Sequence, residues 1–145
     1  MYLDGKTLLC DAQALTVDAA STNTYDSGAA GNDLSEGEPL GIGFIVDVAA
    51  DATTGDETYE FQAIESAAAD LGSPTILALI QPSRTVLTAG SKWVIPIPQG
   101  SKTKRYLGLY FNGGGTTPTI TITAWIAPLS MLGGFKAYAD GFNIT

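Results

Sequence analysis

Two-residue alternation of side chains runs through much of the chain, and it constrains the fold more than any other feature. The clearest run covers residues 119–126, where Ile120, Ile122, Ala124 and Ile126 alternate with Thr119, Thr121, Thr123 and Trp125. Successive side chains of a strand point to opposite faces of a sheet, so this pattern predicts strands with one face in a core. Similar runs predict strands near residues 42–48, 59–63, 93–97 and 106–111.

Turn-forming residues separate these runs and add detail. We expect shorter strands at residues 15–17, 75–79 and 84–87, one Ala-rich helix at 64–71, and hairpins closed at 54–56 and 112–115. Pro96 and Pro98 place their strand at the edge or the end of a sheet, because proline cannot donate to a β-ladder. About eight short strands with frequent turns predict an all-β fold, an antiparallel jelly-roll β-sandwich with extended terminal arms.

The last residues differ from the rest. Residues 128–145 show no clean period, contain Gly133, Gly134 and Gly141, and carry three scattered aromatic residues: Phe135, Tyr138 and Phe142. We expect a single domain over residues 1–145, with 128–145 as a C-terminal arm that packs by these aromatic anchors on its own domain or on a neighbour.

Charge and composition exclude several classes of function. The 15 acidic and 7 basic residues give a net charge of −8, which argues against nucleic acid and anionic membranes as partners. The chain has no histidine and only one cysteine, Cys10, so it lacks the commonest general base and metal ligands. We expect no enzyme activity and no cofactor. The opening residues lack the basic start and apolar run of a signal peptide, so we expect cytoplasmic synthesis without processing.

One acidic segment could instead bind calcium. Asp47, Asp51, Asp56 and Glu57 flank a single predicted turn, and carboxylates are the ligands that calcium prefers. Their spacing matches no EF-hand loop. We therefore expect a solvated turn and no metal site.

Two sets of residues are candidates for a protein interface. Three of the seven basic charges lie within four residues, at Lys102, Lys104 and Arg105. This segment could contact an acidic patch on a partner protein, or it could be a solvated loop at the start of a strand. Tyr106, Tyr110 and Trp125 lie on the outward side of their predicted strands. Outward aromatic side chains are typical of interfaces, although a second covered face within the sandwich and carbohydrate stacking also remain open.

Several short segments, in this order, resemble one family of viral proteins. They are residues 11–14 (DAQA), 20–23 (ASTN), 37–40 (GEPL), 98–100 (PQG), 105–107 (RYL) and 138–142 (YADGF). Their order and the chain length resemble the capsid cement (decoration) proteins of tailed bacteriophages, of the type found on a Bordetella phage. The resemblance extends from about Met1 to Phe142.

The resemblance implies a jelly-roll virion protein on the outside of an icosahedral capsid, made in the host bacterial cytoplasm. Such a protein joins neighbouring copies of the major capsid protein and opposes the internal DNA pressure. It also implies a homo-oligomer, with a homodimer preferred and a homotrimer left open. The family supplies no catalytic residue. The alternative is a jelly-roll carbohydrate-binding module of a phage or bacterial surface protein, in which aromatic side chains such as Trp125 would stack on sugars.

Overall fold

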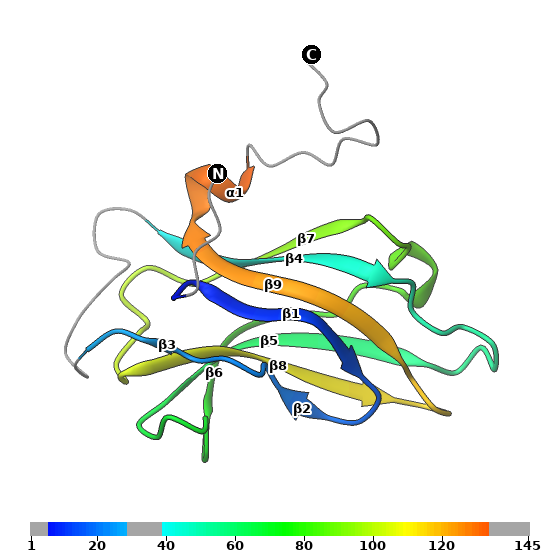
Figure 1. Cartoon of the computed structure of the whole chain (residues 1–145), viewed down its shortest axis with the longest axis horizontal. Helices are drawn as coiled ribbons and strands as arrows, with labels where there is room; N and C mark the ends of the chain where they lie inside the picture. Colours follow the sequence, from blue (N-terminus) through cyan, green and yellow to red (C-terminus); the bar gives the residue numbers. More distant parts are fainter. Residues whose placement is uncertain (1–5, 29–38, 134–145) are drawn as a thin grey trace, which may run out of the picture.

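Two antiparallel sheets face each other in a computed structural model that describes residues 6–28 and 39–133 (Figure 1). One sheet has the strand order β1-β9-β4-β7, and the other has the order β2-β8-β5-β6, with β3 also paired to β8. The elements are β1 (Leu8–Leu15), β2 (Ala19–Ala20), β3 (Tyr25–Asp26), β4 (Leu40–Val48), β5 (Thr58–Ser66), β6 (Thr75–Ile80), the 3₁₀ turn η1 (Arg84–Val86), β7 (Lys92–Pro96), β8 (Tyr106–Gly114), β9 (Ile120–Pro128) and α1 (Leu129–Gly133). The predicted all-β sandwich is confirmed. The more specific jelly-roll topology, which this strand order favours, stays a prediction.

The core lies between the sheets and consists of the alternating residues that the sequence predicts. The inward side chains of the longer strands are almost fully buried, among them Ile42, Phe44, Val46, Phe61, Leu109, Phe111, Ile120, Ile122 and Ala124. Phe61 lies at the centre, with its ring 4.5 Å from that of Phe44 on the opposite sheet and 5.6 Å from that of Phe111 on its own sheet. Tilted rings at these separations add to the stabilisation from burial alone.

Both predicted hairpins are wrong, although both segments do turn. β4 and β5 lie in different sheets, as do β8 and β9, so the two connections carry the chain across the core. Gly55 and Gly115 have φ values of 88° and 84°, the left-handed conformation that glycine adopts most readily. A turn signal reports this local conformation, and it contains no information on which sheet receives the next strand.

Two predictions for short elements are also wrong. The Ala-rich segment 64–71 is no helix: its first three residues complete β5, and Leu71, at φ 60°, folds back over Gly108 of β8. Residues 84–86 form η1 and no strand, because the Ser83 hydroxyl accepts a hydrogen bond from the Thr85 amide and starts a tight turn.

The predicted strand at 15–17 is misplaced, since β1 ends at Leu15 and Val17 is exposed. Other predictions of this kind hold. Thr75 begins β6 as expected, and β7, which ends at Pro96, is an edge strand.

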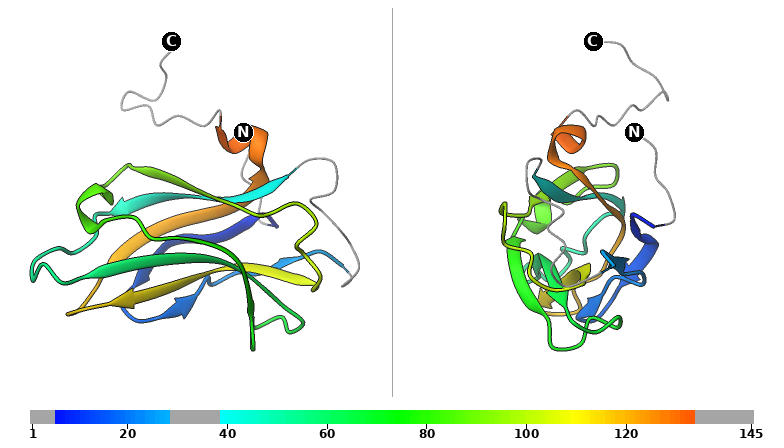
Figure 2. Two further views of the ribbon diagram at one scale, coloured as in Figure 1. Left: turned by 180° about the vertical axis from the view of Figure 1, so that it is seen from behind. Right: turned by 90° about the vertical axis from the view of Figure 1, so that its left-hand side faces the viewer.

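The first residues of the predicted arm fold back on the domain. α1 follows β9 directly and lies on the outer side of the four-stranded sheet at one end, over the start of β4 and beside β9 (Figures 1 and 2). Its Leu129 and Leu132 side chains lie over Gly41 and Gly43, where the missing side chains leave room for them. Residues 134–145, the remainder of the arm, lie outside the described residues.

Candidate interaction surfaces

The basic segment between β7 and β8 does not form one exposed positive patch. Lys102 is buried, with 6% of its surface exposed, and the Lys104 amine donates a hydrogen bond of 2.6 Å to the Thr75 hydroxyl. The segment is held by Glu65, a buried carboxylate of β5 that accepts hydrogen bonds from the Thr103 amide, the Thr103 hydroxyl and the Lys104 amide. The structure thus separates the three basic residues and gives each its own surroundings.

Arg105 is paired within the chain. Its guanidinium donates two hydrogen bonds, of 2.6 and 2.8 Å, to the two carboxylate oxygens of Asp26 on β3, and it lies 5.1 Å from the centre of the Tyr106 ring. The hydrogen bond from Arg105 lowers the pKa of Asp26 from 3.8 to about 2. Much of the charge of Arg105 is therefore already balanced, whereas the Lys104 amine lies at the Thr75 end of β6.

Tyr106 and Tyr110 lie half-buried on the outer face of the five-stranded sheet. Tyr110 is the cross-strand neighbour of Gln62, and Gln62 is the neighbour of Leu79 on β6, so these three side chains form a row across that face. Leu71 lies over Gly108, between the two tyrosines, and is buried there. This face therefore combines aromatic, aliphatic and amide groups, a mixture common at protein interfaces.

Trp125 has a different position from the two tyrosines. It points to the outer side of its own sheet, as the alternation predicts, but only 1% of its surface is exposed. It packs with Ala127 and with Leu132 of α1 in a small second core. Trp125 therefore lies on an outer face that is covered within the same domain, which is one of the alternatives left open by the sequence. An interface role for Tyr106 and Tyr110 stays a prediction. The three anchors Phe135, Tyr138 and Phe142 lie outside the described residues.

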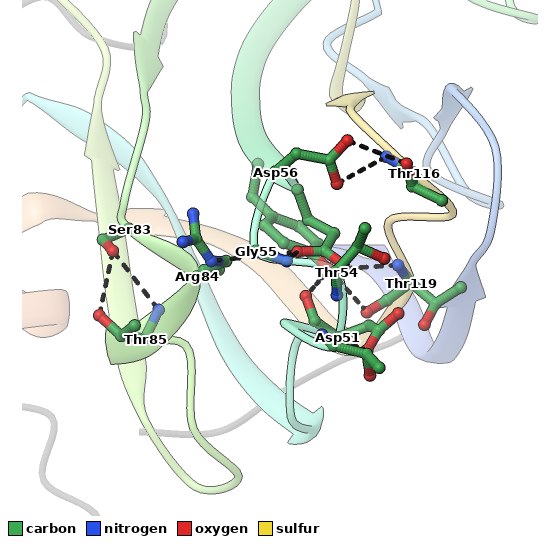
Figure 3. A network of polar contacts seen from close by, with 12 residues as sticks. Asp51, Thr54, Gly55, Asp56, Ser83, Arg84, Thr85, Thr116 and Thr119 are labelled. Carbon is green, nitrogen blue, oxygen red and sulfur yellow. Dashed lines mark hydrogen bonds and ion pairs between the residues drawn. The ribbon is translucent and has the colours of Figure 1, made fainter.

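Polar contacts join the acidic segment to two neighbouring loops at one end of the sandwich (Figure 3). The Asp56 carboxylate accepts hydrogen bonds from the amide and the hydroxyl of Thr116, which ties the β4–β5 connection to the β8–β9 connection. The Tyr59 hydroxyl donates to the Asp51 carbonyl oxygen at 2.7 Å. The same hydroxyl accepts from the Thr119 amide at 3.2 Å. The network fastens the two chain crossings to each other.

The carboxylates of this segment serve these local contacts. Asp51 accepts from Thr53, and Asp47 accepts from the Thr123 hydroxyl on β9. Glu57 is buried and accepts from two backbone amides of its own turn, and its carboxylate lies 3.9 Å from the Arg84 guanidinium. Among the residues that the structure describes, no three acidic or sulfur side chains gather as metal ligands would.

A polar groove of about 480 Å³ lies beside this network, between the ends of β5 and β8 and the segment that precedes η1. Glu60 lines the groove, and its carboxylate accepts hydrogen bonds from Gln62, Gln81 and Asn112. Those bonds, with that from Gln62 foremost, lower the pKa of Glu60. The groove offers amide and carboxylate groups to a polar ligand. The nearby Tyr59 ring lies in the core and is not available for stacking.

Sequence reasoning missed two features of these surfaces. Glu65 falls in the segment predicted as a helix, so its inward position on β5 had no signal. The second feature is the exposure of Ile76 and Leu79 on β6, which are 49% and 45% exposed. The sequence predicted a strand here but not which of its side chains are exposed. The absence of any charged residue between Thr75 and Ile80 was a usable signal for this second feature.

Comparison with known protein families gives one match. The Bbp16 family model matches residues 9–126, which run from the first core residue of β1 to the last core residue of β9. This chain belongs to the Bbp16 family. Bbp16 is a family of Bordetella phage proteins, and membership supports a structural protein of a phage particle. No curated protein matches the chain.

The matched region contains nearly all of both sheets and all the polar contacts described above, whereas α1 lies outside it. The Bbp16 family match therefore covers the sandwich itself, with Tyr106, Tyr110 and the whole of β6 included. None of the helices in the described parts of the chain has the length and apolar character needed to cross a membrane.

Proposed function

We propose that this chain is a capsid cement protein. It binds the outer surface of an icosahedral phage capsid, joins neighbouring major capsid proteins, and so stabilises the shell against the pressure of packaged DNA. The match of the Bbp16 family over residues 9–126 is the observation that carries this proposal. Its partners are the major capsid protein and further copies of itself, and its location is the outside of the virion.

Properties of the sandwich support a mechanical role. The two sheets share one hydrophobic core, and the polar network that involves Asp56, Thr116 and Tyr59 fastens the chain crossings at one end. A domain held at its core and at its loops resists deformation when its neighbours are pulled apart. Binding only to the assembled shell then stabilises that shell by mass action, and many copies around one capsid make modest single contacts sufficient.

We assign the capsid contact to two surfaces of the chain. One is the outer face of the five-stranded sheet around Tyr106 and Tyr110, where half-buried aromatic side chains can act as anchors. The other is the C-terminal segment 134–145 with Phe135, Tyr138 and Phe142, which the sequence predicts as an anchoring arm.

The test adds purified protein to capsids that lack it and measures occupancy by sedimentation and the temperature of shell rupture. Wild type should bind in a regular ratio to the capsid protein and raise the rupture temperature. Tyr110→Ser and a chain that ends at Gly133 should each lower occupancy while keeping the circular dichroism of the sandwich. Val17→Ser removes an exposed apolar side chain elsewhere and serves as the control. Failure of folded wild type to bind any shell would overturn the cement proposal.

A second candidate function is carbohydrate binding, and the polar groove around Glu60 is the observation that favours it. The amide groups of Gln81 and Asn112 and the carboxylate of Glu60 suit sugar hydroxyls. A glycan array distinguishes the two functions: specific binding that is lost in Glu60→Gln would favour the carbohydrate module, and its absence favours cement.

A further inference from the structure

The edges of the two sheets are protected to very different degrees. A sheet edge exposes unpaired backbone groups, and soluble proteins protect such edges with charges, prolines, irregular pairing or very short strands. In the four-stranded sheet, β7 carries Lys92 and Pro96, and β1 carries Asp11 and is interrupted by two register shifts. In the five-stranded sheet, β2 and β3 have two residues each. These edges follow the usual rules.

β6, the opposite edge of the five-stranded sheet, has only one of these protections. Its six residues, TILALI, include no charge and no proline, and its only irregularity is one register shift against β5. Among the described residues, no backbone hydrogen bond outside the regular ladders involves residues 75–80. An uncharged, apolar six-residue strand at a sheet edge is a template for pairing with another chain.

The register shift places two exposed aliphatic side chains on one face of this edge. Ile76 pairs with Ile64 and Leu79 with Gln62, and those two partners are two residues apart on β5, so they share a face. The extra residue on β6, Leu77, lets Ile76 and Leu79 both point outward, where they are 49% and 45% exposed. The edge therefore offers apolar contacts as well as backbone groups.

From this we infer that β6 pairs antiparallel with β6 of a second copy of this chain, which joins the two five-stranded sheets into one continuous sheet. Antiparallel pairing of identical strands is self-complementary, as a two-fold interface requires. In the symmetric register Ile76 of one copy faces Leu79 of the other, on the same outer face, and the two exposed pairs cover each other.

Charge also favours a second copy as the occupant. Each chain carries a net charge of −8, and this uncharged edge lets two copies meet without opposing carboxylates along the strand. The Lys104 amine lies at the Thr75 end of β6, and Glu60 lies at the other end, bonded to Gln81. Antiparallel pairing brings the ammonium group of Lys104 in each copy to the end where the Glu60 carboxylate of the other copy lies.

The size of this interface limits its strength. β6 contributes six residues per copy, compared with ~20–30 residues a side in stable complexes, so the dimer should be weak and concentration-dependent.

Sedimentation of the full chain at increasing protein concentration tests the inference without any capsid. We expect a reversible monomer–dimer equilibrium that Ile76→Lys/Leu79→Lys shifts at least tenfold toward monomer, because like charges then oppose each other at the centre. Val17→Lys/Val86→Lys adds the same charge at exposed apolar residues outside β6 and should dimerise slightly better than wild type, through its lower net charge. Melting temperature and circular dichroism check that each variant is folded.

A mixing experiment tests the antiparallel geometry. Lys104→Glu and Glu60→Lys should each dimerise less than wild type at low salt, and an equimolar mixture should restore dimers, because opposite charges then meet at both ends. A strict monomer at millimolar concentration would overturn the inference, as would a dimer that the β6 lysine variants leave intact. If the protein is monomeric yet decorates capsids, the inference fails and the cement proposal stands; if it dimerises through β6 but binds no capsid, the reverse holds.

Discussion

Leu132 of α1 lies directly over Gly43 of β4. A Cβ atom on Gly43 would come within 2.7 Å of the Leu132 Cδ2 atom and 3.2 Å of the Trp125 ring, so only glycine leaves room for this contact. Gly41 has the same relation to Leu129 and Leu132. These two glycines of β4 face outward, and α1 packs against the strand where they lie.

We predict that Gly43→Ala weakens the packing of α1 on β4 and lowers the free energy of unfolding. The added methyl group must displace Leu132 or strain the Trp125 side chain, and overpacking of this kind costs about 1–3 kcal/mol. Leu132→Ala should cost about 2 kcal/mol, because it removes a buried aliphatic side chain from the second core. Urea unfolding measures the free energy of both variants.

The double variant is the internal control for that contact. Leu132→Ala makes room for the methyl group of Gly43→Ala. If the two residues touch, the double variant should therefore lose less free energy of unfolding than the two single variants lose together. Strictly additive effects would show that α1 does not rest on β4 in solution. Tryptophan fluorescence in a Trp93→Phe background reports the exposure of Trp125 directly, and a red shift is expected in either single variant.

Alternation predicted the core of this fold well, because it depends only on neighbours along one strand. Phe44, Phe61, Phe111 and Ile122 all lie where a period of two places them. The same pattern placed Trp125 on the outward side correctly, but whether an outward side chain is exposed depends on what covers it. Here the cover is α1, a later segment with no periodic signal.

The connections were less predictable than the strands. Gly55 and Gly115 signal turns, yet a glycine at positive φ serves a hairpin and a crossing between sheets equally well. Glu65 shows a related difficulty, because a carboxylate in an Ala-rich segment suits a helix surface as well as a strand that binds a loop. Its partners at Thr103 and Lys104 are distant in sequence, so no local pattern identifies them.

Glu65 should be essential for the position of the segment that carries Lys104. We predict that Glu65→Ala lowers the free energy of unfolding by about 1–3 kcal/mol, because two backbone amides and a hydroxyl lose a charged acceptor in a buried place. Asp11→Ala removes an exposed carboxylate and should change stability by less than about 0.5 kcal/mol. Equal effects of the two substitutions would contradict the role assigned to Glu65.

The pairing of Asp26 with Arg105 should be visible in a titration. Because the pKa of Asp26 is lowered to about 2 in the folded chain, its contribution to stability is complete above pH 3.8 and is lost as the pH falls toward 2. Carboxyl ¹³C chemical shifts should show the low value in wild type and a return toward 3.8 in Arg105→Gln. Asp51, whose pKa is lowered by hydrogen bonds from Thr53, should titrate identically in both proteins.

Cys10 should be nearly inert in the folded protein. Its side chain is fully buried in the core, and burial raises the pKa of the thiol from 9.0 to about 11, so at pH 8 the thiolate population falls roughly 100-fold. A thiol reagent such as DTNB should therefore react slowly with wild type and quickly once denaturant unfolds the chain. The comparison variant Cys10→Ala/Val17→Cys carries its only thiol at an exposed residue and should react at once without denaturant. If wild type reacts as fast as this variant under native conditions, β1 detaches from β9 on the timescale of labelling, and the sandwich would be less rigid than the proposed cement role requires.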